Sequence, residues 1–397
     1  MRYTLLLSFI LWAHTAPVRA AAPVDVASAG ARVDALFADV DTTHTPGCAV
    51  GVRHDGHWLL RKGYGMANLD HAIPIGPDTR FRIASISKQF TAAAVLLLVE
   101  QGRLTLDQDI RSILTDLPDY GDVVRVRHLL THSSGLPDYG PEVGTGPESW
   151  PDYYNAFPEF FREDDSREQD QFFSISRFYA GIRSVGTLKF RPGTHFRYNN
   201  AGYFLLSQIV ERVTGKTLRE FADENIFQPL GMHDTFFNDR AREVVPRRAD
   251  GYLTLPDGRI IRFNTALNMV GDGGVFTTLD DFARWDDNFY HNRLGPAWDH
   301  IIAQMTTPNT QLIYDDPEDR DYRGNYGFGL NITERNGRLK VHHGGHFVGF
   351  KGDQVRYPAL KFSTFIFCNT PQIEPWERSD AIADIYLPAI EQQSTRP

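Results

Sequence analysis

Strand-like segments occur near the beginning and near the end of this 397-residue chain, whereas the stretch between them is mostly helix and loop. Near the beginning, two such runs at 48–52 and 57–62 flank Asp55-Gly56, a dipeptide typical of a tight hairpin. Three more strand-like runs follow near the end, at 339–343, 347–357 and 362–367. We therefore predict an α+β fold, in which both ends of the chain share one antiparallel sheet flanked by helices, with a mostly helical lobe inserted between them.

The longest predicted helix begins near Ser85 and ends at Glu100, just before Gly102. Because it is apolar on nearly every face, it should be buried. Further helices are predicted at 33–40, at 202–214, from Thr278 with Asp281 at the capping-box position, and around 380–390.

No internal repeat, coiled-coil heptad or Gly/Ser linker divides the chain. We therefore expect residues 23–397 to form a single domain. Its α/β lobe is predicted at about 23–105 and 305–397, and its helical lobe at about 106–304.

The first 22 residues have the layout of a cleaved signal peptide. Arg2 precedes an apolar run from Leu5 to Ala13, and small residues follow at 20–22. The run is too short to span a membrane, and no cysteine follows it to carry a lipid. The alternative to a cleaved signal peptide is a bare N-terminal anchor. We expect an exported protein, periplasmic or secreted, with no membrane anchor after cleavage.

The two cysteines of the chain lie in strand-like runs at its opposite ends, at Cys48 and Cys368. If the two ends share one sheet, the thiols are neighbours and can form one disulfide. The alternative is two buried, inert thiols, because disulfide geometry is demanding. The sequence leaves both possibilities open.

Ser85 and Lys88 are the first candidates for catalysis. Three residues apart on a helix, they lie on one face, so the amine can reach the hydroxyl. A serine hydroxyl is a weak nucleophile until a neighbouring base takes its proton. The backbone N–H groups at a helix N-terminus can stabilise the oxyanion that forms after attack. An N-capping serine beside a surface lysine is the competing interpretation.

Tyr198 and Asn200 lie where a loop meets the predicted helix at 202–214. Side chains at such a junction can point into a cleft. A tyrosine acts as a base only if its pKa falls far below 10, which the ammonium of Lys88 can bring about. The competing interpretation is an ordinary core tyrosine.

A strand-like run at 341–350 contains three histidines and two adjacent glycines. The glycines allow another backbone or a substrate to approach. His342 and His343 each begin a His-x-Gly, and a shift of one residue in register exchanges the faces on which they lie. Zinc is not predicted, because neither these histidines nor the pair His128 and His132 complete a recognised set of ligands.

These elements together are similar to the large family of class C β-lactamases, D-alanyl-D-alanine carboxypeptidases, D-aminopeptidases and related esterases. The resemblance covers essentially the whole mature chain and implies a β-lactamase/transpeptidase-like fold. Beside Ser85-x-x-Lys88, Tyr198-x-Asn200 and His343-Gly344-Gly345, it rests on the segments Phe81–Ala84, Gln89–Thr91, His128–Leu136, Pro229–Met232 and Asp272–Gly274.

The resemblance implies a role for each matched residue. Ser85 is the expected nucleophile, Lys88 its proton partner and Tyr198 the general base. The expected substrate contacts are Asn200, His343 and Gly345, and the backbone N–H groups of Ser85 and His346 are expected to form the oxyanion hole. No cofactor or metal is implied.

The third motif departs from the Lys-Thr-Gly of many relatives. His343-Gly344-Gly345 has neither the ammonium nor the hydroxyl that holds a substrate carboxylate, and histidine is largely neutral above about pH 6.5. We therefore expect an exported serine hydrolase acting on an ester or on a D-amino-acid amide or peptide, rather than an efficient β-lactamase. A true class C-like β-lactamase and a non-catalytic binding or assembly protein with the same fold are the alternatives.

The expected partner is a small-molecule or peptide substrate. A formal charge of −9 without a Lys/Arg block argues against nucleic acid and anionic membrane surfaces. The aromatic and acidic segment at 137–173 is expected either to cover the cleft between Ser85 and Tyr198 or to pack on the outer surface. The sequence does not indicate the oligomeric state.

Overall fold

The computed structural model describes residues 26–40, 42–138, 175–265, 267–314 and 325–394. The predicted signal peptide and nearly all of the 137–173 segment lie outside the described residues. Within the described chain, a six-stranded sheet combines strands from both ends of the sequence, all paired antiparallel. Its order is β10 (Asn331–Arg335), β11 (Arg338–Phe347), β12 (Phe350–Tyr357), β13 (Phe362–Cys368), β1 (Cys48–His54) and β2 (His57–Tyr64).

The two ends of the chain meet where β1 pairs with β13. In this pairing Cys48 lies directly opposite Cys368, and the two residues form a disulfide. Of the two possibilities that the sequence left open, the structure has the bonded one. The bond joins segments that are 320 residues apart in the sequence.

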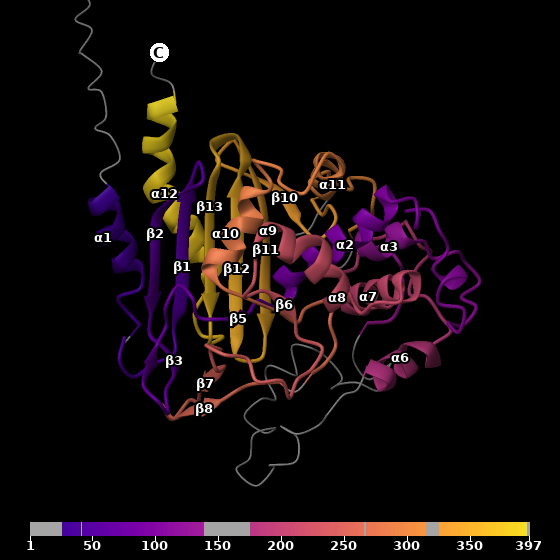
Figure 1. Cartoon of the computed structure of the whole chain (residues 1–397), viewed down its shortest axis with the longest axis horizontal. Helices are drawn as coiled ribbons and strands as arrows, with labels where there is room; N and C mark the ends of the chain where they lie inside the picture. The colour runs from indigo at the N-terminus through magenta and orange to yellow at the C-terminus, as the bar shows by residue number, and fades with distance from the viewer. Residues whose placement is uncertain (1–25, 41, 139–174, 266, 315–324, 395–397) are drawn as a thin grey trace, which may run out of the picture.

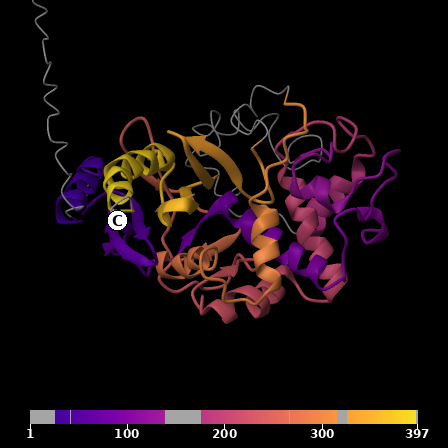
Figure 2. The same ribbon diagram turned by 90° about the horizontal axis from the view of Figure 1, so that it is seen from above.

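The two faces of the sheet pack against different helices (Figures 1 and 2). Helices α1 (Val26–Leu36) and α12 (Pro375–Ser394) cover one face, and α2 (Lys88–Glu100) and α10 (Leu279–Asp287) lie toward the other. Side chains along β13 alternate between the faces, as the pleat of a strand requires. Phe362 and Ile366 belong to the α1/α12 cluster, whereas Phe365 and Phe367 contact Phe282 of α10 at ring-centroid distances of 5.1 and 5.3 Å.

Helix α2 runs through the centre of the molecule. Its first eleven residues, from Lys88 to Leu98, are all buried, which confirms the burial predicted from its apolar sequence. Each fully buried leucine or valine stabilises the fold by about 1.5 to 3 kcal/mol relative to exposure. Three polar side chains, Lys88, Gln89 and Thr91, are buried within this apolar helix.

The remaining elements surround this centre. The helices are α3 (Val126–Leu130), α6 (Ile175–Ser184), α7 (Asn200–Thr214), α8 (Leu218–Ala222), α9 (Gln228–Leu230) and α11 (Ala297–Met305), with a π-helical turn at Asp223–Phe227 and 3₁₀ turns at Ala84–Ser87, Ile110–Ser112 and Pro358–Leu360. Short strands form three smaller sheets: β3 (Met66–Asn68) with β4 (Ile73–Pro74), β7 (Tyr252–Thr254) with β8 (Ile260–Arg262), and β9 (Val275–Thr277) between β5 (Phe81–Arg82) and β6 (Phe236–Phe237).

Three predicted helix bounds were wrong. The first helix covers 26–36 rather than 33–40, because its early turns are built from small residues that carry no periodic apolar signal. The helix expected from Ser85 begins at Lys88, after the 3₁₀ turn Ala84–Ser87. The last helix is longer than the predicted 380–390 and begins at Pro375.

The middle of the chain is less separate from the sheet than predicted. Helix α10 lies within the predicted helical lobe but packs its Phe282 on the six-stranded sheet. The predicted cap of α10 is present, since the side chain of Thr278 accepts a hydrogen bond from the backbone N–H of Asp281. Strand β10 was not predicted at all.

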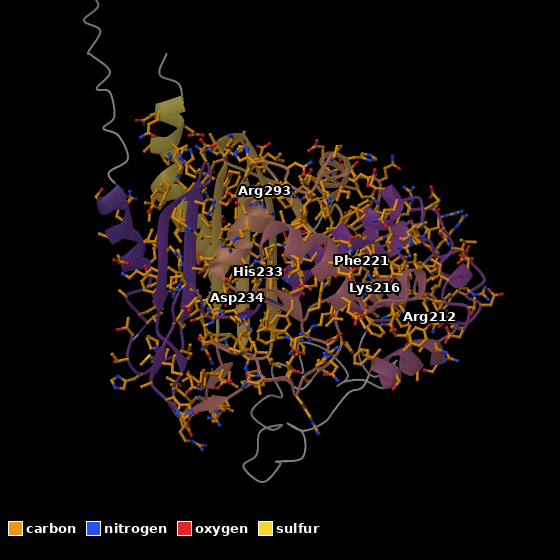
Figure 3. The ribbon with its side chains drawn as sticks, in the orientation of Figure 1. Arg212, Lys216, Phe221, His233, Asp234 and Arg293 are labelled. Atoms are coloured by element: carbon orange, nitrogen blue, oxygen red, sulfur yellow. A yellow bond between two sulfur atoms is a disulfide. The ribbon has the colours of Figure 1, made fainter. Side chains whose placement is uncertain are left out.

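Charged side chains occupy much of the outer surface (Figure 3). Asp234, labelled there, accepts hydrogen bonds from Arg80 and Arg247, and so ties the segment before β5 to the loop after β6. None of the helices in the described part of the chain combines the length and the apolar composition that a membrane crossing needs.

Candidate active site

Ser85 lies in a tight turn between β5 and α2. Every residue from Phe81 to Phe90 is buried except Ser85, which is partly exposed. Ala84, directly before it, has a φ of 46°, a left-handed conformation that costs energy for any residue with a Cβ. The fold thus holds the Ser85 hydroxyl at the surface of an otherwise buried segment. Strained backbone such as that of Ala84 is often found at functional sites.

Gly345 of β11 packs directly on this turn. A Cβ at position 345 would lie 2.4 Å from the carbonyl oxygen of Ile83 and 3.2 Å from the backbone nitrogen of Ser85. Only glycine permits so close an approach. The predicted substrate contact at Gly345 is therefore first a packing position, which brings the backbone of β11 beside the nucleophile.

The amine of Lys88 lies at the centre of the site. Its Nζ donates to Ser85 Oγ at 3.1 Å, to Asn200 Oδ1 at 2.8 Å and to the backbone oxygen of Asp272 at 2.7 Å. All three acceptors are formally neutral. Burial lowers the pKa of Lys88 to about 8, although Asp272 and Asp138 oppose this shift. Near neutral pH a fraction of the amine is therefore neutral and able to accept a proton from Ser85 as its hydroxyl attacks.

Asn200 is the first residue of α7 and is oriented by Asp138. The side chain of Asn199 caps the helix by accepting from the N–H of Gly202 at 2.6 Å. Asp138 accepts from the backbone N–H of Asn200 at 3.0 Å and from its Nδ2 at 3.4 Å. These contacts turn the amide oxygen of Asn200 toward Lys88. Its predicted contact with a substrate amide stays a prediction.

Tyr198 lies against Lys88 and the buried imidazole of His132. The Nζ of Lys88 is 4.8 Å from the centre of the Tyr198 ring, and the His132 ring is 4.3 Å from it on a tilted plane. His132 Nδ1 accepts from the N–H of Asn199 at 3.0 Å, and burial keeps the pKa of His132 well below its usual value. A neutral imidazole thus supports Tyr198. The sequence had indicated only that His132 belongs to no zinc site.

The structure also settles the register of the histidine strand. His343 faces Tyr198 and Lys88, whereas His342 lies on the opposite face. His343 Nδ1 is 2.6 Å from the carbonyl oxygen of Gly344 and therefore carries the proton, so Nε2 accepts from the hydroxyl of Tyr326 at 3.0 Å. Burial lowers the pKa of His343 to about 3. The ring is neutral, only 2% exposed, and has both nitrogens engaged, so it offers no positive charge to a substrate.

The backbone N–H of His346 is one of the two predicted oxyanion donors. It follows Gly345, whose packing brings this part of β11 beside Ser85. The imidazole of His346 points to the other face, near Lys351, and burial lowers its pKa to about 4. The oxyanion role of Ser85 and His346 stays a prediction that this packing supports.

The loop that contains Asp272 forms a further wall of the site. Thr91 Oγ1 donates to the carbonyl oxygen of Gly271 at 2.7 Å, and Lys88 donates to that of Asp272. Gly271 has a φ of 116°, and a Cβ there would lie 2.4 Å from the carbonyl oxygen of Tyr203. The loop is thus fixed between α2 and α7. Sequence reasoning had used Asp272 only as part of the family resemblance.

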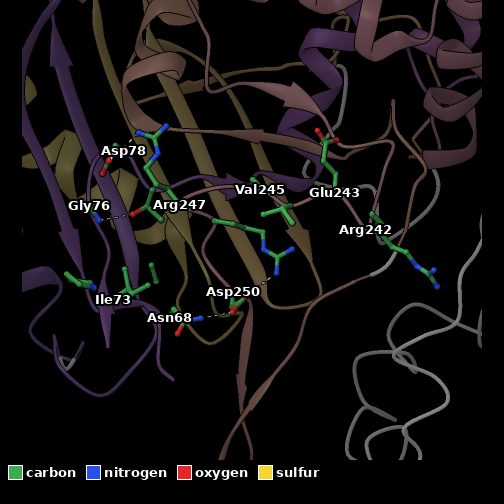
Figure 4. Close-up of a pocket in the computed structure, with 15 residues that line it drawn as sticks. Asn68, Ile73, Gly76, Asp78, Arg242, Glu243, Val245, Arg247 and Asp250 are labelled. Atoms are coloured by element: carbon green, nitrogen blue, oxygen red, sulfur yellow. Dashed lines mark hydrogen bonds and ion pairs between the residues drawn. The ribbon is translucent and has the colours of Figure 1, made fainter. Parts of the chain in front are cut away.

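A separate cavity of about 770 Å³ lies beside β3 and β4 (Figure 4). Ile73, Asp78, Arg247 and Asp250 are among its lining residues, and none of the predicted site residues lines it. Its location therefore does not change the assignment of the candidate site. Among the described residues, no group of three histidine, aspartate, glutamate or cysteine side chains converges as a metal site would require.

Comparison with known proteins is consistent with this site. A model of the family described as Beta-lactamase matches residues 33–386. The D-aminopeptidase of Gluconobacter oxydans (strain 621H) is 31% identical over 329 residues, which are 82% of this chain and 56% of that protein. The chain therefore spans little more than half the length of the curated relatives that it matches.

Two solved structures illustrate the fold. The octameric penicillin-binding protein homologue from Pyrococcus abyssi has a TM-score of 0.74 at 26% identity, and the match covers 92% of this chain and 77% of that chain. The D-amino acid amidase from Ochrobactrum anthropi SV3, complexed with L-phenylalanine amide, has a TM-score of 0.67 at 22% identity, with coverages of 94% and 100%. The predicted α+β fold of the β-lactamase/transpeptidase type is confirmed, and the predicted enzyme class, a serine hydrolase, agrees with these similarities.

Proposed function

Because the chain belongs to the β-lactamase family, a family of serine hydrolases, we propose that it cleaves an amide or ester through an acyl-enzyme on Ser85. The observation that carries the proposal is the 3.1 Å contact between Lys88 Nζ and Ser85 Oγ, made by a buried amine with neutral acceptors. Burial outweighs the charges of Asp272 and Asp138 and keeps the pKa of Lys88 lowered, so its amine can serve as a base.

In the proposed reaction, Lys88 and Tyr198 together take the proton of Ser85 as Oγ attacks the substrate carbonyl. The backbone N–H groups of Ser85 and His346 stabilise the oxyanion. The proton then passes through Tyr198 to the leaving amine or alcohol, and the carbon–nitrogen or carbon–oxygen bond breaks. Water, deprotonated by the same groups, attacks the ester on Ser85 and releases the acid. Asn200 holds Lys88 in place through the 2.8 Å contact.

The proposed substrate is a D-amino-acid amide or short peptide with a free amine. Two observations favour it over a β-lactam. The curated relatives of this chain include D-aminopeptidases, among them that of Gluconobacter oxydans described above. In addition, His343 is neutral and buried, so the third motif lacks the cation that would hold a carboxylate on the leaving-group side.

We propose that the protein is exported and that no membrane anchor is left after cleavage of the leader. The Cys48–Cys368 disulfide supports this location, because such bonds persist mainly in oxidising compartments. Fractionation of the source cells, with the mature N-terminus determined by mass spectrometry, tests it. A cytoplasmic protein that still carries the uncleaved leader would contradict the proposed export.

The acyl-enzyme is tested by treating the folded protein with a fluorophosphonate and locating the adduct by mass spectrometry. We expect one adduct, on Ser85, that is lost in Ser85→Ala and retained in Ser112→Ala, which changes an exposed serine. No adduct on the folded wild-type protein would favour a non-catalytic role. A rate panel of D-alanine p-nitroanilide, p-nitrophenyl acetate, a muropeptide and a chromogenic cephalosporin tests the substrate. Fastest turnover of the cephalosporin would replace the proposal with a β-lactamase.

A further inference from the structure

Arg82 is a buried cation that lacks an acceptor. It lies in β5, three residues before Ser85, and is 6% exposed. Its Nε is fully covered without a hydrogen-bond partner, and among the described residues no carboxylate lies within ion-pair distance of the guanidinium. The guanidinium lies over the ring of Phe347, whose centre is 5.6 Å from Cζ. A buried guanidinium without an acceptor is costly, so an anionic ligand would complete the site.

Asp272 is the complementary group. Its carboxylate lies close enough to Arg82 and Lys88 for both to act on its charge, yet it forms no ion pair with either. Apart from its own backbone N–H, no donor among the described residues reaches the carboxylate. The residue is partly exposed, and its backbone is fixed by Lys88. Asp272 therefore presents unused acceptors at the rim of the site.

The two side chains come from adjacent antiparallel segments. Arg82 pairs with Phe276 of β9, the N–H of Ile83 donates to the carbonyl oxygen of Val275 at 3.0 Å, and a Cβ on Gly273 would lie 3.7 Å from Ala84. The segment containing Asp272 thus runs beside the turn that carries Ser85.

This pair lies on the acyl side of the proposed reaction. The leaving group must lie near Tyr198, which returns the proton to it, and the Tyr198 ring is 6.4 Å from that of His343. Phe347, on which Arg82 packs, is four residues further along β11, or about 13 Å at the usual rise of a strand. The acyl group of the substrate extends toward this end of the strand.

We propose that Arg82 and Asp272 together bind a zwitterionic acyl residue: an N-terminal acidic D-amino acid, whose ammonium pairs with Asp272 and whose side-chain carboxylate pairs with Arg82. The inference rests on the proposed function and narrows its substrate class. An ion of one sign alone would leave one of the two side chains without a hydrogen-bonded partner, whereas a zwitterion can pair with both.

Four p-nitroanilides of nearly equal size test the proposal: α-D-aspartyl with both charges, D-alanyl with the ammonium, succinyl with the carboxylate, and propionyl with neither. We expect the aspartyl substrate to have the highest kcat/KM, with about a 10- to 100-fold loss for each missing charge. Asp272→Asn should remove the preference for a substrate ammonium and keep that for the carboxylate. Arg82→Gln should remove the preference for the carboxylate and keep that for the ammonium. Asp257→Asn, at an exposed turn, is the matched control.

A second measurement does not depend on turnover. Thermal unfolding of Ser85→Ala is followed with the matching amides: D-aspartic acid α-amide, D-alaninamide, succinamate and propionamide. We expect the largest increase in Tm with the aspartic amide. After the further change Asp272→Asn, this increase should fall to that given by succinamate, because only the contact with Arg82 is left. Equal shifts with all four amides would overturn the inference and leave the acyl-enzyme untouched. A missing fluorophosphonate adduct on Ser85 would instead overturn the proposed function.

Two outcomes of the variant kinetics are also decisive. Each rate is divided by the amount of Ser85 that reacts with the fluorophosphonate. If Arg82→Gln and Asp272→Asn then slow the hydrolysis of all four anilides equally, the two side chains only position the turn that carries Ser85, and the inference fails. Arg82→Lys keeps the cation, and so should preserve part of the preference for the carboxylate if the inference holds. Because only folded protein reacts with the fluorophosphonate at Ser85, the labelled amount gives the concentration of folded enzyme, and misfolded protein does not affect the comparison.

Discussion

Lys88 and Gln89 are neighbours on α2 and both fully buried, but they belong to different kinds of network. Lys88 reaches only formally neutral oxygens, and its pKa falls to about 8. Gln89 accepts from Trp285 Nε1 at 2.6 Å and lies beside an ion pair between Arg356 and Asp286, whose side chains are 1% and 2% exposed. One side of α2 thus holds a buried amine that forms no ion pair, the uncompensated side, whereas the other side packs beside a complete ion pair between α10 and β12, the compensated side.

The uncompensated side should show the largest effect. Lys88→Met removes the proton acceptor for Ser85, and we expect kcat to fall by about 10²- to 10⁴-fold. The fold should not weaken, because the variant also removes a buried charge whose hydrogen-bond acceptors are all neutral. Turnover of the best anilide, together with urea unfolding, checks both expectations. A variant that is inactive and also strongly destabilised would place Lys88 among the structural residues.

The compensated side should show the opposite pattern. Asp286→Ala leaves Arg356 buried without its partner, so we expect a loss of about 3 to 5 kcal/mol of unfolding free energy. Its activity, divided by the amount of Ser85 that reacts with the fluorophosphonate, should be unchanged. The double variant Asp286→Leu with Arg356→Met should recover most of the stability, because neither charge is then left alone. No recovery would mean that the pair contributes through shape rather than charge.

The pH dependence of stability sharpens the same comparison. The unfolded chain holds the Lys88 proton up to its ordinary pKa of 10.5, whereas the folded chain loses it at about 8. Between these values the unfolded state binds more protons, so this residue makes stability rise with pH, by about 3 kcal/mol in total. Below about pH 8 its destabilising effect is fully present.

Urea unfolding of the wild type and Lys88→Met at pH 7, 8 and 9 measures this contribution. We expect the stability advantage of the variant to shrink as pH increases. A constant difference would show that the Lys88 pKa is not lowered by folding. On the same argument, kcat should increase through about pH 8 as the amine becomes available as a base.

Sequence reasoning found the residues that carry a motif and missed those that only tertiary contacts bring in. Ser85 and Lys88 are three positions apart, so local geometry suffices to place them together. Asp138 and Asp272 reach the site from distant loops; no local pattern marks Asp138, and Asp272 was marked only as part of a matching segment, without a role. The central strands β1 and β13 were predictable because they are runs of apolar, β-branched and aromatic residues, whereas the edge strand β10 has Ile332 as its one apolar residue.

The choice between His342 and His343 shows the limit most clearly. Adjacent strand residues differ only in the face on which they lie, and pairing with β12 fixes that face. The hydroxyl of Tyr326, seventeen residues earlier, then holds the His343 ring. Neither contact can be read from the motif itself.

That hydroxyl supplies the smallest predicted effect. Tyr326→Phe removes the donor to His343 Nε2 and leaves a buried acceptor unsatisfied, which costs about 1 to 3 kcal/mol. Part of this cost should appear as a 5- to 10-fold lower kcat/KM, roughly 1 kcal/mol, because the His343 ring supports the Tyr198 side of the site. A double-mutant cycle with His343→Asn should show a coupling of about 0.5 to 3 kcal/mol. Additive losses would mean that Tyr326 acts on the site through its other aromatic neighbours, such as His132 at 4.6 Å, rather than through the histidine strand.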